Sequence, residues 1–149
     1  MSKEKFTILG KTVREPTKKL ETFPAPRRVI SVIMETEEVT GLCPITGQPD
    51  WYKIQIQYRP CKRCLESKAL KLYLWSFRQE GTFCENLSEK IAEDIFKVVK
   101  PHWISVEATM RPRGGISITS TAYISKKEYV VRKISSDDGS KVIKRRVKQ

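Results

Sequence analysis

Histidine and long apolar runs are nearly absent from the sequence. It contains one histidine, His102, and no uninterrupted apolar stretch of the roughly 20 residues that a membrane span needs. Residues 1–7 are mainly polar and charged, so they lack the apolar core of a secretory signal peptide. These absences argue against histidine-based metal sites and membrane spans, and they predict a cytoplasmic location.

Cysteine is too sparsely placed for a conventional zinc site. Of the four cysteines, only Cys61 and Cys64 form a close pair, and structural zinc sites normally use two such pairs or one pair with histidines. A site that gathers Cys43 and Cys84 as well stays open. The simpler interpretation is a basic turn in which the spacing of Cys61 and Cys64 is coincidental, so no metal is predicted.

Positive charge is in excess and is concentrated at one end. The net charge is +12, and residues 126–149 carry nine basic against three acidic residues, a surplus of six. Such a balance favours anionic partners such as nucleotides, phosphorylated cofactors or RNA. We expect one domain over residues 1–125 and a basic C-terminal extension over residues 126–149. A solvated tail, an RNA-binding arm and a subunit contact all remain open for the extension.

A single cysteine stands in a segment suited to a loop. Residues 40–50 contain two glycines and two prolines, which disfavour both helix and mid-strand. Cys43 lies in this segment, and Asp50 follows it seven residues later. Reactive groups are common on loops held by a rigid scaffold. Cys43 is therefore a candidate nucleophile with a carboxyl group nearby, while a small buried apolar residue is the alternative.

Alternating apolar and polar residues predict four strands in two hairpins. Residues 28–37 are rich in β-branched side chains, and residues 51–58 alternate with a period of two. These two strands flank the Cys43 segment and would pair around it. Residues 104–110 and 116–124 form the second predicted hairpin, with a basic glycine-containing turn between them.

Two amphipathic helices are predicted between the hairpins. Residues 67–78 place apolar side chains on one face and Lys68, Lys71 and Arg78 on another. A second helix lies between Gly81 and Pro101, with Asn86 or Ser88 as its N-cap. Its predicted apolar face comprises Leu87, Ile91, Ile95, Val98 and Val99. The order ββααββ indicates an α+β fold with a mainly antiparallel sheet and helices on one face.

Four motifs in order resemble one enzyme family. They read Cys-Pro-x-Thr-Gly-Gln-Pro-Asp from Cys43, Glu-Ser-Lys-x-x-Lys from Glu66, Phe-x-Glu from Phe83, and Pro-Arg-Gly-Gly-Ile-Ser from Pro112. This series resembles the NADPH-dependent nitrile reductases that act on 7-cyano-7-deazaguanine in queuosine biosynthesis, a tRNA-modification pathway. The resemblance covers about half of the chain, outside the leader and the basic tail.

The resemblance implies covalent catalysis. The cysteine matching Cys43 attacks the nitrile carbon and forms a thioimide, and the aspartate matching Asp50 gives and takes protons. Addition of a thiolate turns a poor hydride acceptor into a C=N bond that is easier to reduce. Two hydrides from NADPH complete the conversion to 7-aminomethyl-7-deazaguanine, and no metal is required.

The resemblance also implies a substrate pocket. Its positions are matched here by Leu65, Glu66, Ser67, Cys84 and Glu85. Glu85 would accept hydrogen bonds from the amino group and ring N–H of the base. A surface glutamate and a helix N-cap are the alternatives for Glu66 and Ser67, respectively. Cys84 departs from the family, which usually has histidine there, and a neutral thiol cannot replace imidazole as a proton shuttle.

Cationic side chains match the positions implied to contact NADPH. These are Lys68, Lys71 and Arg113, with Gly114 beside the last, and a 2′-phosphate is a suitable ligand for such groups. From charge alone, the stripe formed by Lys68, Lys71 and Arg78 also fits a solvated helix face.

The implied architecture is the tunnelling fold, a four-stranded antiparallel sheet with two helices on one face. Subunits of that fold join into rings, and single-module members form a decamer of two pentamers with pockets at subunit interfaces. An alternative interpretation is an archaeosine-synthase-like amidinotransferase that acts on the same nitrile in tRNA, but those proteins lack the Glu-Ser-Lys-x-x-Lys motif. A non-catalytic RNA-binding protein is a further alternative. For a reductase, contact with tRNA is not expected.

Overall fold

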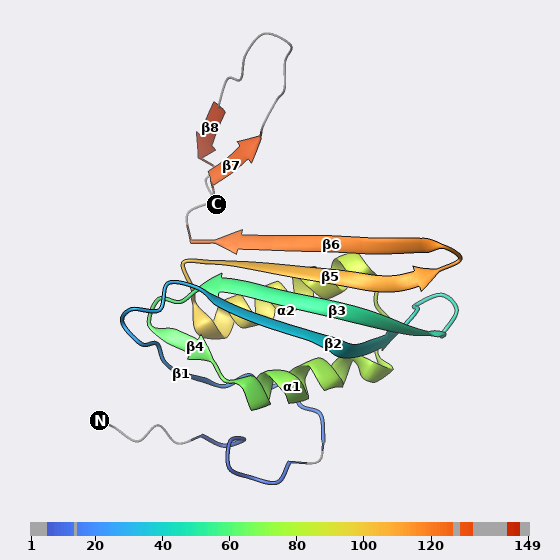
Figure 1. The fold of residues 1–149 in the computed structure, drawn as a ribbon, viewed down its shortest axis with the longest axis horizontal. Coiled ribbons are helices and arrows are strands. Elements are labelled where there is room, and N and C mark those ends of the chain that lie inside the picture. The colour runs from blue at the N-terminus through green and yellow to red at the C-terminus, as the bar shows by residue number, and fades with distance from the viewer. Residues whose placement is uncertain (1–5, 14, 127–128, 133–142, 147–149) are drawn as a thin grey trace.

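The centre of the protein is a four-stranded antiparallel sheet (Figure 1). The computed structural model describes residues 6–13, 15–126, 129–132 and 143–146. The strand order is β2-β3-β5-β6, and the strands span Val32–Leu42, Pro49–Arg59, Trp103–Arg113 and Ile116–Ser125. Each neighbouring pair is antiparallel, as the two predicted hairpins required.

Strand β3 carries the alternation most clearly. Its inward side chains are almost fully buried, at 0 to 1% exposure: Tyr52, Ile54, Ile56 and Tyr58. The first predicted strand was misplaced, because β2 begins at Val32 and extends to Leu42 rather than ending at residue 37. A bulge between Thr36 and Val39 restores the inward face, and pairing with β3 then outweighs the weak strand preference of Gly41.

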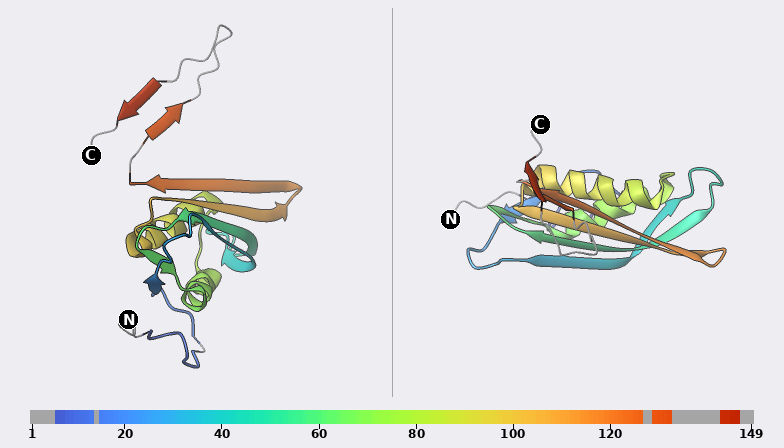
Figure 2. Two further views of the ribbon diagram at one scale, coloured as in Figure 1. Left: turned by 60° about the vertical axis from the view of Figure 1, so that its left-hand side comes forward. Right: turned by 90° about the horizontal axis from the view of Figure 1, so that it is seen from above.

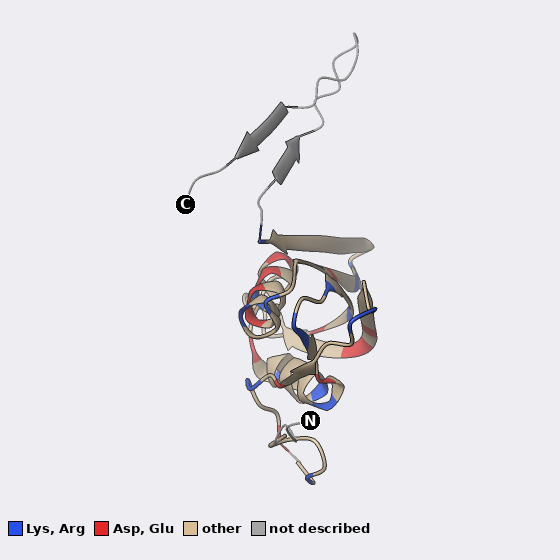
Figure 3. Ribbon diagram, turned by 90° about the vertical axis from the view of Figure 1, so that its left-hand side faces the viewer, with Lys and Arg blue, Asp and Glu red and all other residues tan. Residues whose placement is uncertain are grey.

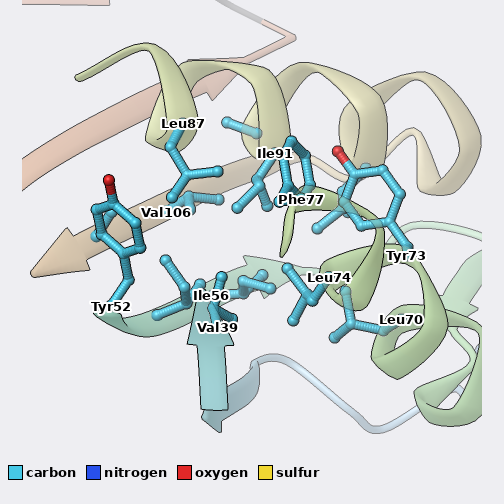
Figure 4. Close-up of a cluster of buried hydrophobic side chains, with 14 of the residues drawn as sticks. Val39, Tyr52, Ile56, Leu70, Tyr73, Leu74, Phe77, Leu87, Ile91 and Val106 are labelled. Atoms are coloured by element: carbon cyan, nitrogen blue, oxygen red, sulfur yellow. The ribbon is translucent and has the colours of Figure 1, made fainter. Parts of the chain in front are cut away.

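Two helices cover one face of the sheet (Figure 2). Helix α1 spans Ser67–Trp75 and continues into a 3-10 turn at Ser76–Gln79, and helix α2 spans Cys84–Val99. Helix α1 and the 3-10 turn lie against β2, while α2 covers β5 and β6. Their shared core contains Tyr52, Leu74 and Ile91 (Figure 4). The predicted α+β arrangement of four antiparallel strands and two helices is therefore confirmed.

The helix ends differ in part from the prediction. Phe83 is the N-cap of α2 and makes no side-chain capping bond, so neither Asn86 nor Ser88 caps the helix. The helix ends at Val99, as expected from the following Pro101, and its C-cap Lys100 adopts a left-handed conformation with φ of 49°. Val98 is 38% exposed and does not belong to the buried face.

A second small sheet was not predicted from the sequence. Strand β1, Thr22–Pro24, pairs antiparallel with β4, Arg63–Leu65. Cys64 is buried in β4, so the basic-turn interpretation was wrong for that residue, while Cys61 is exposed. Strands of three residues carry too little periodicity to be recognised in a sequence.

The C-terminal extension contains a two-stranded antiparallel pair. Strand β7 spans Tyr129–Arg132 and β8 spans Ile143–Arg146, with Tyr129 opposite Arg146. Within the described part of the chain, no helix is long and apolar enough to cross a membrane.

Candidate active site

Cys43 begins a tight loop between β2 and β3. Its N–H donates to the carbonyl of Gln48 at 2.8 Å, and its carbonyl accepts from Gly47 N–H at 2.9 Å. Gly47 has φ of 69°, a conformation that side chains with a Cβ rarely adopt. The loop is shorter than expected, because Leu42 ends β2 and Asp50 already lies in β3.

The Cys43 loop is fixed to the segment before α2. Leu42 N–H donates to Glu80 O at 2.9 Å, and Thr82 N–H donates to Leu42 O at 3.1 Å. A Cβ added at Gly81 would lie 3.2 Å from Pro44 Cα, which is tighter than ordinary packing. This close approach brings the cysteine loop next to the first turn of α2.

The Cys43 sulfur lies in surroundings that stabilise its anion. Hydrogen bonds from the hydroxyl and N–H of Thr46, from the Arg113 guanidinium and from Ile45 N–H lower the pKa of Cys43 to about 6. Burial opposes this shift but does not cancel it. At neutral pH the group is therefore a thiolate, the nucleophilic form of cysteine.

Arg113 links the thiol to the carboxyl group. Its Nε lies 3.1 Å from Asp50 Oδ1, and Asp50 is only 3% exposed. The tight turn at Gly114 and Gly115, with φ of 57° and 80°, folds the end of β5 back into β6 next to this pair. The sequence predicted Cys43 and Asp50 in one site and assigned Arg113 to NADPH, but it did not predict the contacts of Thr46 and Arg113 with the thiol. The arginine beside two glycines was the available signal.

Cys84 is buried near the Asp50 carboxyl group. Its Sγ donates to the carbonyl of Ala108 at 3.2 Å, so its proton is used within the protein. Burial, followed by the neighbouring Glu85 charge, raises the pKa of Cys84. The side chain therefore stays a neutral thiol and supplies no cation to the site.

Glu66 caps helix α1 with both carboxylate oxygens. Oε1 accepts from Lys68 N–H at 2.9 Å, and Oε2 accepts from Ala69 N–H at 2.8 Å. Glu66 is 5% exposed, so it is not a surface glutamate, and it takes the capping position predicted for Ser67. The preceding Leu65 is also buried and donates its N–H to Tyr58 Oη at 2.9 Å.

Lys68 and Lys71 have different surroundings despite their shared motif. The Lys68 ammonium donates to the carbonyls of Ile8, at 3.2 Å, and Lys11 in the N-terminal segment. Lys71 is exposed and lines a groove of about 510 Å³ between α1 and β2. Ser67 and Arg78 line the same groove, so only part of the predicted cationic stripe faces it.

Glu85 lies in the first turn of α2, which covers β5 and β6, whereas the groove of Lys71 lies beside β2 at the other edge of the sheet. It is exposed and lines a separate groove of about 350 Å³ with Ser88, Ser120 and Tyr123. Acidic residues recur along this helix (Figure 3). The single chain thus gathers Cys43, Asp50, Cys84 and Arg113. The predicted residues left elsewhere are Leu65, Glu66, Ser67, Lys68, Lys71 and Glu85.

The cysteines and carboxylates form no metal centre in the described part of the chain. No group of three or more histidine, cysteine, aspartate or glutamate side chains there is arranged to hold an ion. All four cysteines are free thiols.

Comparison with known proteins gives one consistent family. The model of the QueF-like protein family matches residues 49–129. The NADPH-dependent 7-cyano-7-deazaguanine reductase of Syntrophus aciditrophicus is 48% identical over 124 residues, covering 82% of this chain and 88% of the relative. The protein of the same name from an Anaeromyxobacter species is 47% identical over 110 residues, covering 72% and 90%.

The same architecture occurs in a solved structure. The crystal structure of an archaeosine synthase QueF-Like in the apo form superposes with a TM-score of 0.60 at 21% identity. The match covers 63% of this chain and 92% of that one. This likeness is one of fold and agrees with the expected tunnelling fold. The family match and the similar relatives show that the chain belongs to the QueF-like protein family.

Proposed function

We propose that this protein is an NADPH-dependent reductase that converts 7-cyano-7-deazaguanine into 7-aminomethyl-7-deazaguanine, as a cytoplasmic enzyme of queuosine biosynthesis. The observation that carries the proposal is the Cys43 thiol, whose pKa is lowered to about 6 beside a buried carboxyl group. The names of the close relatives supply the substrate and the cofactor.

The first step is addition of Cys43 to the nitrile. The thiolate forms a C–S bond with the nitrile carbon, and one C≡N π bond becomes a lone pair on nitrogen. Asp50 passes a proton to that nitrogen, which gives a neutral thioimide. Arg113 contacts both groups, so it holds the sulfur and the carboxyl group in one arrangement before the substrate arrives.

The later steps return the sulfur to its starting state. NADPH supplies two hydrides in succession when it is bound. Once the carbon has gained the first hydride, the nitrogen lone pair forms a C=N bond as the C–S bond breaks, and this bond accepts the second hydride. Cys43 leaves as a thiolate, a departure that its low pKa favours. Asp50 again exchanges the protons that the nitrogen gains on the way to the amine.

The groove between α1 and β2 suits a phosphorylated cofactor. Lys71 and Arg78 line it, and guanidinium and ammonium groups bind phosphate through charge-assisted hydrogen bonds. The apolar side chains of Leu74 and Trp75 offer the remaining contact surface. Lys68 joins the cofactor site only if it releases the carbonyls of Ile8 and Lys11.

The scattered recognition residues favour a pocket shared between subunits. Glu85 and Lys71 lie in separate grooves, and neither groove is lined by Cys43. A ring of subunits would bring the Glu85 groove of one chain to the Cys43 loop of another. Mixing inactive Cys43→Ala and Glu85→Ala subunits tests this arrangement, because hybrid sites with both residues intact should recover activity.

The direct test is to add 7-cyano-7-deazaguanine and NADPH and to follow cofactor absorbance and product mass. The reductase oxidises two NADPH molecules for each amine formed. A Cys43 adduct without NADPH oxidation, followed by amidine formation on tRNA when an amine donor is added, would identify the amidinotransferase instead.

A further inference from the structure

Among the described residues, three tyrosines are buried in the core, and the hydroxyl of one of them lacks the hydrogen bond that the other two make. Tyr58 Oη accepts from Leu65 N–H at 2.9 Å, and Tyr73 Oη donates to Asp94 Oδ2 at 2.8 Å. Tyr52 is 1% exposed, yet its hydroxyl has no hydrogen-bond partner among the described residues. Leaving a buried hydroxyl without a partner is destabilising, so a hydroxyl in this position calls for an explanation.

The position of Tyr52 connects it to the candidate active site. It follows Asp50 by two residues on β3, so both side chains point to the same face of the sheet. Figure 4 shows its hydroxyl at the edge of the apolar cluster. Burial raises the pKa of Tyr52 far above its ordinary value, and the charges of Asp50, Cys84 and Cys43 raise it further, against Arg113. The phenol is therefore neutral and carries a proton to donate.

Asp50 presents a second incompletely satisfied atom on that face. Its buried Oδ1 has Arg113 Nε at 3.1 Å but makes no hydrogen bond of good geometry. The nearby Cys84 proton is already given to the Ala108 carbonyl. Tyr52 is thus the neutral donor of this face, next to a carboxyl group that exchanges protons.

We propose that Tyr52 is a substrate-binding residue whose hydroxyl donates a hydrogen bond to the 6-carbonyl of the bound deazaguanine. This inference rests on the proposed function. In 7-cyano-7-deazaguanine the 6-carbonyl lies next to the 7-substituent, so one edge of the molecule presents an acceptor beside the reacting nitrogen. The 6-carbonyl would accept a hydrogen bond from Tyr52 Oη, and the nitrile nitrogen beside it would face Asp50.

Binding requires that the edge of the substrate reach two buried atoms. Arg113 contacts both Asp50 and Cys43, and its side chain is 38% exposed, so it is the group that must yield as the nitrile enters. The contact with Tyr52 would then select bases with a carbonyl at position 6. A base that lacks this group would leave the hydroxyl unsatisfied.

The test is the affinity of the oligomeric protein for 7-cyano-7-deazaguanine, measured by calorimetry in a Cys43→Ala background so that no adduct forms. Adding Tyr52→Phe should weaken binding roughly tenfold, about the loss of one neutral hydrogen bond. An analogue without the 6-carbonyl should bind weakly to the parent, with no further loss in the Tyr52→Phe variant. Thermal stability should stay equal or rise, because an unsatisfied buried hydroxyl is removed.

Tyr58→Phe and Tyr73→Phe are the matched controls. Both should lower thermal stability and leave substrate affinity unchanged, because their hydroxyls bond within the protein. Equal affinity in the parent and the Tyr52→Phe variant would overturn the inference alone. A loss of stability without a loss of affinity in Tyr52→Phe would also overturn it. Failure of the Cys43→Ala parent to bind the nitrile would instead overturn the proposed function.

Discussion

The reactive and recognition parts of the molecule are organised differently. Cys43 receives its activating hydrogen bonds from its own loop and from Arg113 of the same chain. The residues expected to hold the substrate and the cofactor are divided between a groove beside α1 and another beside α2. One part is complete in a single chain, whereas the other is dispersed.

The difference follows from the range of the forces involved. A thiolate is stabilised by donors within hydrogen-bond distance, so a short loop and one arginine suffice. A purine-like base and a dinucleotide need a large enclosing surface, and one sheet with two helices leaves its edges open. Catalytic competence and binding competence can therefore be lost separately, and the following variants separate them.

The largest expected effect is on the nucleophile itself. Cys43→Ala should lower NADPH oxidation at least about a thousandfold, because it removes the thiolate that forms the thioimide. The exposed Cys61 gives the control, and Cys61→Ala should keep full activity. Substantial activity in Cys43→Ala would mean that hydride reaches the free nitrile.

The next effect is on thiol activation. Alkylation of Cys43 by iodoacetamide, followed by mass spectrometry, should rise with pH around a midpoint of about 6, because the thiolate fraction grows as pH passes the pKa. Arg113→Met should move the midpoint upward, because it removes a donor to the sulfur. Each unit of that shift lowers the rate roughly tenfold in the acidic range. An unchanged midpoint would show that Arg113 does not lower the pKa of Cys43.

A smaller effect should follow from moving the loop. Gly81→Ala places a methyl group 3.2 Å from Pro44 Cα, so the Cys43 loop must shift by a few tenths of an ångström. We expect a several-fold fall in kcat at nearly unchanged NADPH KM, since misplacement by about 1 Å can cost a hundredfold. Gly41→Ala is the control, because its Cβ would meet its neighbours at an ordinary 3.5 Å.

Substitutions of Lys68 and Lys71, which belong to one motif, should have different effects on the KM for NADPH. Lys71→Met should raise the KM for NADPH by about three- to tenfold, because one phosphate contact is lost from an exposed site. Lys68→Met should act mainly on the N-terminal segment, whose carbonyls it binds. Equal effects of both variants on NADPH KM would show that the N-terminal segment moves aside for the cofactor.

The smallest effect on activity is expected at Glu66. Removing the carboxylate in Glu66→Ala should lower the free energy of unfolding by about 1–2 kcal/mol, as for other lost N-caps, while a Ser67→Ala variant should cost less. Urea unfolding measures both. A large rise in substrate KM without a loss of stability in Glu66→Ala would instead place this carboxylate in the pocket.

The sequence predicted the sheet and helices well where periodicity was long. The alternation from Tyr52 to Tyr58 and the helical pattern around Ile91 both placed side chains in the core as expected. The predictions failed where a tertiary contact decides the local structure. Pairing with β3 extends β2 to Leu42, and the buried Glu66 displaces Ser67 as the cap of α1.

The candidate site was predictable as a motif but not as a geometry. The sequence predicted that Cys43 and Asp50 lie close together, since both belong to one hairpin. It did not reveal that Arg113, which lies 63 positions after Asp50 in the chain, contacts both groups, because that depends on the register of β5 against β3. The unpartnered hydroxyl of Tyr52 was likewise hidden, since burial alone does not tell whether a hydroxyl is satisfied.

Covalent catalysis by Cys43 is tested by the intact mass of the protein after incubation with 7-cyano-7-deazaguanine, before and after NADPH is added. We predict a mass increase of one substrate molecule on Cys43, with loss of the adduct and release of the amine once NADPH is present. A protein that consumes NADPH and forms the amine without any adduct at Cys43, or that retains the adduct unchanged in NADPH, would contradict the account.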